Sequence, residues 1–312
     1  MRETAPAIQT ERLGRRYGTT RALDGLDLEI PPGAIVGLLG PNGAGKTTAL
    51  LLLSTLLSPS DGTAHIFGHD VTRHRREVRR RLGLVFQEAS VDGLLTVREN
   101  LFFAARLAGL GGTAAGGAVA QALERTGLAA HSSRPARLLS GGWRRFLDIA
   151  RATLHHPDLL ILDEPTVGLD PEHRERVWAL LEGYRKQHGT TILFSTHYLA
   201  EAESADRVVL LSEGRMVASD TPAALRSTVG HEMAEIEGPG AERLAGALRV
   251  RGATKSSVRT ERGFRIGLLG SRDAVVELAA SAPGIERFAL RPTTLEDVYF
   301  SLTQNKVADE RR

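Results

Sequence analysis

The sequence predicts an α/β domain that carries a mostly helical insertion and is followed by a small α+β domain of ferredoxin-like order. Short, continuous apolar runs at 34–39, 82–86, 159–162 and 191–194 support the first domain. Such runs are too short for helices and are typical of strands covered on both faces, as in a parallel sheet. A change of pattern near Gly230 marks the second domain.

Helical patterns lie between the apolar runs, as expected where β and α elements alternate. The run at 34–39 passes through a glycine-rich turn into helix-forming residues 47–57, which gives a strand, a loop and a helix. Further helices are predicted at 97–107, 119–128 and 172–188. We expect residues 96–139 to form the helical insertion, with the glycine- and alanine-rich segment 109–117 as a mobile linker.

The C-terminal region contains short elements in the order β-α-β-β-α-β, which is the ferredoxin-like order. The predicted elements are a strand at 233–236, a helix at 241–249, a hairpin of strands 256–260 and 264–269, a helix at 272–280 and a strand at 285–290. Thr294 and Asp297 form an N-cap signature for a last helix through Leu302. We therefore predict a first domain over 1–228, an accessory domain over 229–305 and a tail over 306–312.

Composition and charge exclude several classes of protein. The chain has 312 residues, 42% hydrophobic and 25% charged, as in soluble globular proteins. The absence of cysteine excludes disulfides, thiolate zinc sites and a cysteine nucleophile. Apolar runs fall far short of the ~20 residues that cross a bilayer. The N-terminus has no apolar signal-peptide core, so we expect a protein that stays inside the cell.

The charge balance predicts no nucleic-acid partner. The formal net charge is only +3, whereas nucleic-acid binding normally shows as a concentrated basic stripe. Arginines do gather at residues 73–81. A solvated helix face or contact with an anionic lipid or nucleic acid would each explain this cluster.

A phosphate-binding loop is predicted between the first apolar run and its helix. Gly40-Pro-Asn-Gly-Ala-Gly-Lys-Thr47 fits the pattern G-x-x-x-x-G-K-[ST]. Glycines let the backbone wrap, so that N–H groups and the helix N-terminus face phosphate oxygens. Lys46 would reach the β- and γ-phosphates, and the Thr47 hydroxyl would hold Mg²⁺. The alternative is a tight glycine turn with an incidental lysine. The residues assigned to ATP here are Gly40, Asn42, Gly43, Gly45, Lys46, Thr47 and Thr48.

Two carboxylates follow the apolar run at 159–162, where ligands bind in open α/β sheets. Adjacent side chains on a strand leave on opposite faces. We therefore expect Asp163 and Glu164 to serve different ligands, one Mg²⁺ through its water shell and the other the attacking water. A pair of acidic residues that merely caps a strand exit is the alternative.

Leu139-Ser-Gly-Gly-Trp143 resembles LSGGQ, the signature motif of the ATPase subunits of ABC transporters. The remaining motifs of that family follow in the expected order: Tyr17 resembles the adenine-stacking aromatic, Gln87 the Q-loop glutamine, Gly168-Leu-Asp170 the D-loop and His197 the switch histidine. Together they cover about residues 8–220. One position departs from the family, because Trp143 replaces the usual glutamine. Trp143 either packs against the helical insertion or modifies the nucleotide interface.

The resemblance implies an ATPase that works as a homodimer. In this family the signature of one copy closes over nucleotide held by the phosphate loop of the other, and this chain has one of each. Glu164 is then the catalytic carboxylate, His197 the γ-phosphate sensor, and Lys46 with Mg²⁺ the charge compensation. The remaining implied ATP contacts are Tyr17, Gln87, Ser140, Gly141, Gly142 and Asp170, and the implied Mg²⁺ ligands are Thr47, Gln87 and Asp163.

Two segments resemble drug-exporting ATPases of the daunorubicin/doxorubicin-resistance type, namely 87–101 and 294–303. This resemblance implies export of a drug, antibiotic or lipid-like compound through a separate multi-spanning membrane permease, with the ATPase peripheral on the cytoplasmic face of the membrane. An importer ATPase and a soluble ABC ATPase acting on ribosomes or nucleic acid are the alternatives. The C-terminal domain would be regulatory, would reinforce the dimer, or would be a stabilising appendage.

Overall fold

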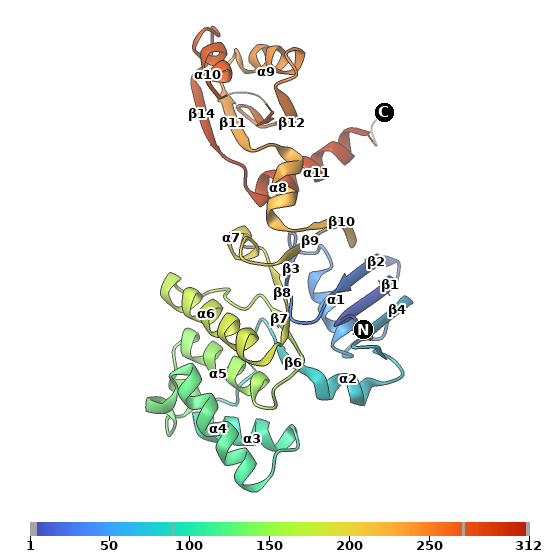
Figure 1. Cartoon of the computed structure of the whole chain (residues 1–312), viewed down its shortest axis with the longest axis vertical. Coiled ribbons are helices and arrows are strands. Elements are labelled where there is room, and N and C mark those ends of the chain that lie inside the picture. Colours follow the sequence, from blue (N-terminus) through green and yellow to red (C-terminus); the bar gives the residue numbers. More distant parts are fainter. Residues whose placement is uncertain (1–4, 89, 270–271, 310–312) are drawn as a thin grey trace. The chain divides into compact units, whose positions relative to one another are not determined.

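The computed structural model describes residues 5–88, 90–269 and 272–309, with side chains through Thr303 (Figure 1). Its contacts divide the chain into two compact units. Unit 1 comprises Met1–His197 and Leu211–Met216, and unit 2 comprises Tyr198–Leu210 and Val217–Arg312. Strands β9 (Arg207–Ser212) and β10 (Arg215–Asp220) therefore have residues in both units. The predicted boundary between residues 228 and 229 stays a prediction.

Four parallel strands form the centre of unit 1. They are β3 (Ile35–Leu39), β6 (Leu82–Val85), β7 (Leu159–Asp163) and β8 (Thr191–Thr196), and they lie in the order β3-β8-β7-β6. Every residue of β3, β7 and β8 is buried, as the continuous apolar runs predict. The register pairs Leu39 with Thr196 and Asp163 with Ser195, so the carboxyl ends of these strands meet at one edge.

Unit 1 also contains an antiparallel sheet, which the sequence analysis did not predict. Two of its strands precede the phosphate loop in the sequence and two follow it. Its strands β1 (Ile8–Tyr17), β2 (Thr20–Ile30), β4 (Asp61–Ile66) and β5 (His69–Asp70) lie in the order β2-β1-β4-β5. Register shifts interrupt the pairing of β1 with β2 between Thr10 and Arg16. The resulting pattern of buried and exposed residues is irregular and gives no clear period-two signal.

Two predicted helices accompany the parallel sheet of unit 1, with α2 (Arg75–Arg81) beside them. Helix α1 (Lys46–Leu53) ends four residues earlier than predicted, because Thr55 adopts a left-handed backbone conformation with φ 66°. Helix α6 (Pro171–His188) runs as predicted between Asp170, whose carboxylate caps it, and Gly189.

The predicted insertion, residues 96–139, contains α3 (Val97–Leu107), α4 (Gly112–Thr126) and the 3₁₀ turns Ala129–His131 and Ala136–Leu138. Helix α5 (Gly141–Thr153) follows it. Helices α3, α4 and α5 pack against one another (Figure 1). Helix α3 matches its prediction and opens with a capping box between Thr96 and Glu99. The prediction of a mobile linker over 109–117 is wrong for most of its length, because α4 already begins at Gly112 and buries Ala115 and Val119.

Unit 2 contains the predicted order of short elements. After α7 (Leu199–Ala202) and α8 (Pro222–Val229) come β11 (Glu232–Glu237), α9 (Ala241–Val250), β12 (Thr254–Arg259), β13 (Gly263–Leu268), α10 (Arg272–Ala280) and β14 (Arg287–Pro292). The antiparallel sheet has the order β12-β13-β11-β14. Ile236 and Ile266 pack with Leu244 and Leu248 of α9 in its core.

A last helix, α11 (Leu295–Asp309), closes unit 2 and extends beyond the predicted end at Leu302. Its start is fixed as predicted, because the backbone N–H and the hydroxyl of Thr294 both donate to Asp297 Oδ2 at 2.9 Å. Residues 310–312 of the predicted tail lie outside the described residues. Among the helices that the structure describes, none is long and apolar enough to span a membrane.

Candidate nucleotide-binding site

The predicted phosphate-binding loop connects β3 to α1 and depends on its glycines. A Cβ at Gly40 would lie 2.3 Å from the carbonyl oxygen of Leu211, so no larger residue fits there. Gly45, the N-cap of α1, has φ 100°, which only glycine adopts without strain. A backbone hydrogen bond from a distant part of the sequence also holds the loop, because Gly214 N donates to Ala44 O at 3.2 Å. The loop therefore brings the N-terminus of α1, with its free N–H groups, to the sheet edge.

Lys46 is the cation of this loop and is only 5% exposed. Its Nζ donates to the carbonyl oxygens of Gly40 at 2.7 Å and Pro41 at 3.1 Å. Burial lowers the pKa of Lys46, and the negative charges of Glu164 and Asp163 oppose this shift. The ammonium group is therefore anchored by the loop and lies within the electrostatic influence of both carboxylates.

A cavity of about 350 Å³ opens beside this loop, within the size range of small-molecule sites. Residues from the loop, from the segment after β6 and from the end of β7 converge on it. Its lining comprises Ala22, Asn42, Gly43, Ala44, Gly45, Lys46, Thr47, Thr48, Gln87 and Glu164. Except for Gly40, the predicted loop contacts thus lie together, and Gln87 and Glu164 join them from distant parts of the sequence.

The carboxylates of Asp163 and Glu164 have different partners. The prediction assumed that side chains alternate along a strand, but β7 ends at Asp163 and Glu164 has a left-handed backbone. Thr47 Oγ1 donates to Asp163 Oδ2 at 3.0 Å, and the Ser195 hydroxyl donates to Asp163 Oδ1. Glu164 leaves the strand in a left-handed conformation, with φ 46°, and its Oε2 lies 3.0 Å from His197 Nδ1. The two carboxylates therefore face separate sets of side chains.

Ser195 is a site residue that the sequence analysis missed. Besides donating to Asp163, its Oγ accepts a 2.9 Å hydrogen bond from Glu164 N. It can do so because β8 pairs with β7 in a register that places Ser195 beside Asp163. The position of Ser195, two residues before His197, was a local signal for a site residue. The pairing of β8 with β7, however, is not visible in the sequence.

The donor set suits Mg²⁺. The Thr47 hydroxyl and the Asp163 carboxylate are neighbouring hard oxygen donors, and Gln87 lines the same cavity. No cluster of three or more His, Asp or Glu side chains that could hold a metal exists in the described part of the chain. Mg²⁺ at phosphate-binding sites is generally held by one or two carboxylates together with substrate phosphates.

The signature residues form the start of α5 rather than the cavity wall. Ser140 is the N-cap of this helix, and both Ser140 and Gly141 are exposed. Gly142 is buried against His173, whose ring a Cβ would approach to 2.3 Å. His173 in turn lies with Nδ1 2.7 Å from Asp170 Oδ2, so the signature and the predicted D-loop are connected through this histidine.

Trp143 packs between elements of the same unit. Its ring centroid lies 4.9 Å from that of His131 and 5.6 Å from that of Phe146, and the Arg176 guanidinium lies 4.9 Å above the indole. These contacts support the packing interpretation of the departure from LSGGQ.

Tyr17 is 46% exposed, lies outside the cavity lining and has the Arg15 guanidinium 4.9 Å from its ring centroid.

Fold and site together define a P-loop ATPase of the ABC class: a buried strand leads through the phosphate loop into a helix, and a second strand ends in the acidic pair. Comparison with known proteins agrees. The family model for the ABC transporter matches residues 23–167. The chain is 41% identical to the daunorubicin/doxorubicin resistance ATP-binding protein DrrA of Streptomyces peucetius, over 98% of this chain and 94% of that protein.

Two further similarities point the same way. The Nod factor export ATP-binding protein I of Cupriavidus metallidurans is 37% identical, over 97% of this chain and 99% of that protein. A dimeric ATP-binding cassette in a post-hydrolysis state, bound to ADP and Pi, superposes with a TM-score of 0.63 at 26% identity, over 69% of this chain and 98% of that one. The chain belongs to the family of ABC transporter ATP-binding proteins, and it is an ATP-hydrolysing subunit of an ABC exporter.

Proposed function

We propose that the chain powers efflux of a drug, antibiotic or lipid-like compound through a separate multi-spanning permease, as a homodimer on the cytoplasmic face of the membrane. The observation that carries this proposal is the cavity in which Lys46, Thr47, Gln87 and Glu164 converge. The names of the relatives, which refer to drug resistance and to export, support the class of cargo. The names of these relatives refer neither to import nor to a soluble ABC ATPase that acts on ribosomes or nucleic acid.

The cavity would hold the phosphates of ATP. Backbone N–H groups of the loop from Gly40 to Thr48 would face the phosphate oxygens, with Lys46 at the β- and γ-phosphates. Tyr17, which is 46% exposed, would stack on the adenine. Mg²⁺ would be held by Thr47, Asp163 and Gln87, and when bound it compensates the charge of the phosphates.

Hydrolysis would depend on Glu164 and His197. Glu164 is 9% exposed, lines the cavity and has His197 Nδ1 3.0 Å away. Glu164 would orient the attacking water, and His197 would sense the γ-phosphate. This assignment agrees with the contacts of Asp163, whose carboxylate accepts hydrogen bonds from the hydroxyl groups of Thr47 and Ser195.

A second copy of the chain would complete the site. Ser140, Gly141, Gly142 and Asp170 do not line the cavity of their own chain. Ser140 and Gly141 instead stand exposed at the N-terminus of the 13-residue α5, where N–H groups can receive an anion. The signature of each copy would close over the nucleotide held by the other.

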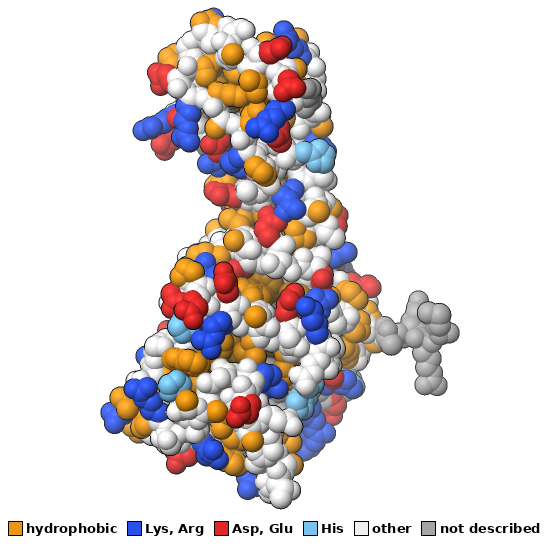
Figure 2. Space-filling model, turned by 60° about the vertical axis from the view of Figure 1, so that its left-hand side comes forward, with side chains coloured by type: hydrophobic (Ala, Val, Ile, Leu, Met, Phe, Trp, Pro, Cys, Tyr) orange, Lys and Arg blue, Asp and Glu red, His pale blue; other side chains and the backbone are white. Residues whose placement is uncertain are grey.

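The permease would dock at a cleft of about 970 Å³ in unit 1. Its walls include Arg75, Arg76, Arg79 and Arg80 of α2, together with Leu107 of α3 and Leu110, which follows that helix. An acidic and apolar segment of the permease would match these walls in charge and polarity. Docking of the permease would explain the arginine cluster at residues 73–81 without a nucleic-acid partner. On the face in view, Figure 2 shows basic, acidic and apolar side chains mixed rather than a basic stripe.

The C-terminal elements would form a ferredoxin-like accessory domain over residues 229–305. Their order β-α-β-β-α-β and the sheet order β12-β13-β11-β14 support this. One face of the sheet packs on α9 and α10 and forms the core with them. Ion pairs between β11 and β14, such as Glu235–Arg291 and Glu237–Arg287, lie outside that core.

Glu164→Gln tests the proposed function. The amide cannot act as the catalytic carboxylate, so Mg²⁺-dependent ATP hydrolysis should fall by about 100-fold or more. ATP should still bind, and ATP-stabilised dimers should accumulate, as light scattering can measure. Glu175→Gln, in an exposed carboxylate of α6, is the matched control and should behave as the parent chain. Undiminished hydrolysis by Glu164→Gln would contradict the assignment.

A further inference from the structure

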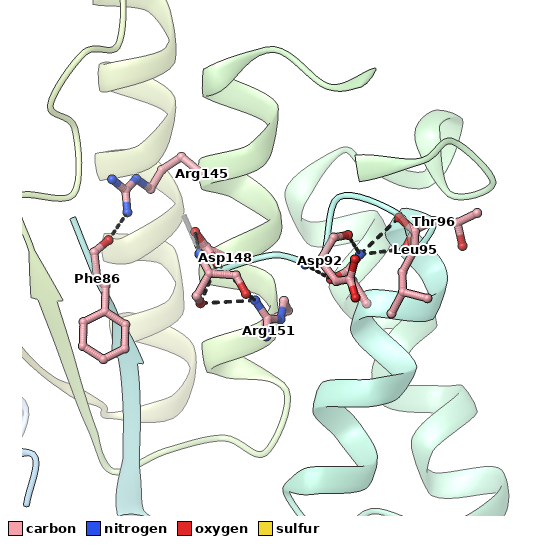
Figure 3. A network of polar contacts seen from close by, with 9 residues as sticks. Phe86, Asp92, Leu95, Thr96, Arg145, Asp148 and Arg151 are labelled. Carbon is pink, nitrogen blue, oxygen red and sulfur yellow. Dashed lines mark hydrogen bonds and ion pairs between the residues drawn. The ribbon is translucent and has the colours of Figure 1, made fainter. Parts of the chain in front are cut away.

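One face of α5 holds the segment that follows β6. Arg145, Asp148 and Arg151 recur every three residues along the helix and therefore project from the same side. Figure 3 shows Arg145 directed to the backbone of Phe86, and Asp148 beside Arg151. The segment that these side chains contact contains Gln87, which lines the nucleotide cavity.

Arg145 makes the most direct connection to that segment. Its Nη1 donates to Phe86 O and its Nη2 to Gln87 O, each at 2.6 Å. The residue is 5% exposed. Burial lowers the pKa of the Arg145 guanidinium, and the charges of Asp148 and Asp163 oppose this shift. Arginine remains charged in proteins, so these are charge-assisted hydrogen bonds in a fixed fork geometry.

The far end of the segment is fixed at Ser90 from the same helix and at Asp92 from α3. Ser90 N lies 3.2 Å from both carboxylate oxygens of Asp148, and Arg151 Nη1 donates to Ser90 O at 2.6 Å. Two residues later, Asp92 N donates to Asn100 Oδ1 at 2.9 Å, and Asn100 Nδ2 donates to Asp92 O at 2.9 Å. The backbone around Gln87 is therefore held at Phe86, Gln87, Ser90 and Asp92.

We propose that Arg145 is a positioning residue for Gln87: it fixes the Gln87 peptide so that the side chain stays in the nucleotide cavity. The helix that begins with the signature and the segment that carries Gln87 then move as one body, with Asp148 and Arg151 securing the other end. This inference rests on the proposed function, in which Gln87 is a ligand of Mg²⁺. Arg145 itself does not line the cavity.

The bonding pattern argues for positioning rather than for general stability. The guanidinium donates to two successive carbonyl groups of one loop, which fixes the peptide planes on both sides of the Gln87 Cα. A lysine has a single ammonium group without the planar fork and can satisfy the two acceptors only loosely. Arg145→Lys therefore retains the charge but loses most of the orientation, whereas Arg145→Ala loses both.

The test compares Arg145→Ala and Arg145→Lys with Gln87→Ala as the reference and Arg98→Ala as the control. Arg98 is an exposed arginine of α3, which packs against α5. Three quantities are measured on the full chain: the Mg²⁺ concentration for half-maximal ATP hydrolysis, the dissociation constant of ATP in EDTA, and hydrogen exchange of the backbone from residue 83 to 92 without nucleotide.

Loss of Arg145 should raise the half-maximal Mg²⁺ concentration about tenfold, with Arg145→Lys in between and Arg98→Ala unchanged. ATP binding in EDTA should be unaffected, and hydrogen exchange around Gln87 should become faster. An unchanged Mg²⁺ requirement and unchanged exchange in Arg145→Lys, with Gln87→Ala shifted, would overturn this inference alone. If Gln87→Ala is itself unshifted, or the parent chain needs no Mg²⁺, the proposed function fails instead. Should Arg145→Ala not fold, Arg145→Lys decides.

Discussion

Asp163 and Glu164 show how two neighbouring residues acquire separate tasks. Asp163 ends the strand and is held by two hydroxyl groups, from Thr47 and Ser195. Glu164 is the first residue beyond the strand, and its left-handed backbone turns its carboxylate toward His197. A non-glycine residue in this conformation costs of order 1 kcal/mol or more, which is typical of functional sites.

Ser195 should matter both for stability and for turnover. Ser195→Ala removes the acceptor of Glu164 N and one donor to Asp163, and leaves a buried N–H without its partner. We expect the chain to lose about 1–3 kcal/mol of stability and to hydrolyse ATP more slowly. Thermal unfolding and steady-state ATPase measurements check this, with the exposed Ser133→Ala as the control. Wild-type stability and turnover in Ser195→Ala would refute the importance of this link.

The contiguous part of the site could be predicted from the sequence, but the connections between its parts could not. The phosphate loop and the acidic pair lie within short motifs, so their residue types and spacing suffice. Ser195 and Arg145 act across elements, through the register of β7 with β8 and through the packing of α5. Arg145 is the second residue after the signature, but nothing in the sequence gives its partners.

At the scale of elements, the strands buried on both faces were predictable and the antiparallel sheet was not. Strands β3, β7 and β8 are continuous apolar runs because both their faces are covered. Strand β1 mixes buried Leu13 with exposed arginines and changes register three times against β2. Where bulges shift the pairing of strands, the alternation of apolar and polar residues no longer indicates which side chains are buried.

Helix α4 was missed at its N-terminal half because glycine has a low helix propensity. Gly112, Gly116 and Gly117 lie within it, and the burial of Ala115 and Val119 against neighbouring helices outweighs their cost. Propensity therefore predicted a loop where tertiary packing makes a helix.

Gly116→Ala and Gly117→Ala should stabilise the chain. No atom outside the helix lies within 4 Å of a Cβ placed at either position, so the methyl group meets no obstacle. Each substitution should add up to about 1 kcal/mol, which thermal unfolding can detect as a higher melting temperature. Gly112→Ala is the contrasting variant and should not stabilise, because Gly112 has φ 52°. Equal effects at all three positions would contradict this reading of α4.

At the scale of the whole molecule, each unit has its own core and its own buried polar connections. The core of unit 2 includes Ile236, Leu244 and Ile266. The partly exposed Arg291 forms a bidentate ion pair with the buried Asp297, with Nη1 and Nη2 2.6 and 2.8 Å from the carboxylate oxygens. This pair connects β14 to α11, so it fixes the last helix on the sheet.

Asp297 should make stability depend on pH. Burial raises the pKa of Asp297, but hydrogen bonds from Arg291 and Thr294 lower it more, so the folded-state pKa lies below the ordinary 3.8. The carboxylate therefore stabilises the fold fully above pH 3.8, and this contribution disappears as the pH falls through the folded-state pKa. Melting curves over this range should show a steeper acid loss for the parent chain than for Asp297→Asn. Asp273→Asn, at an exposed position, should retain the parent slope.

The indole of Trp143 gives this protein a natural optical reporter. The chain contains only two tryptophans, and the other, Trp178, lies with its ring 4.6 Å from Phe194 of β8. Trp143 stands three residues after Ser140 between two imidazoles and a guanidinium, groups that quench or shift emission as they move. Its fluorescence should therefore follow events at the signature without any attached dye.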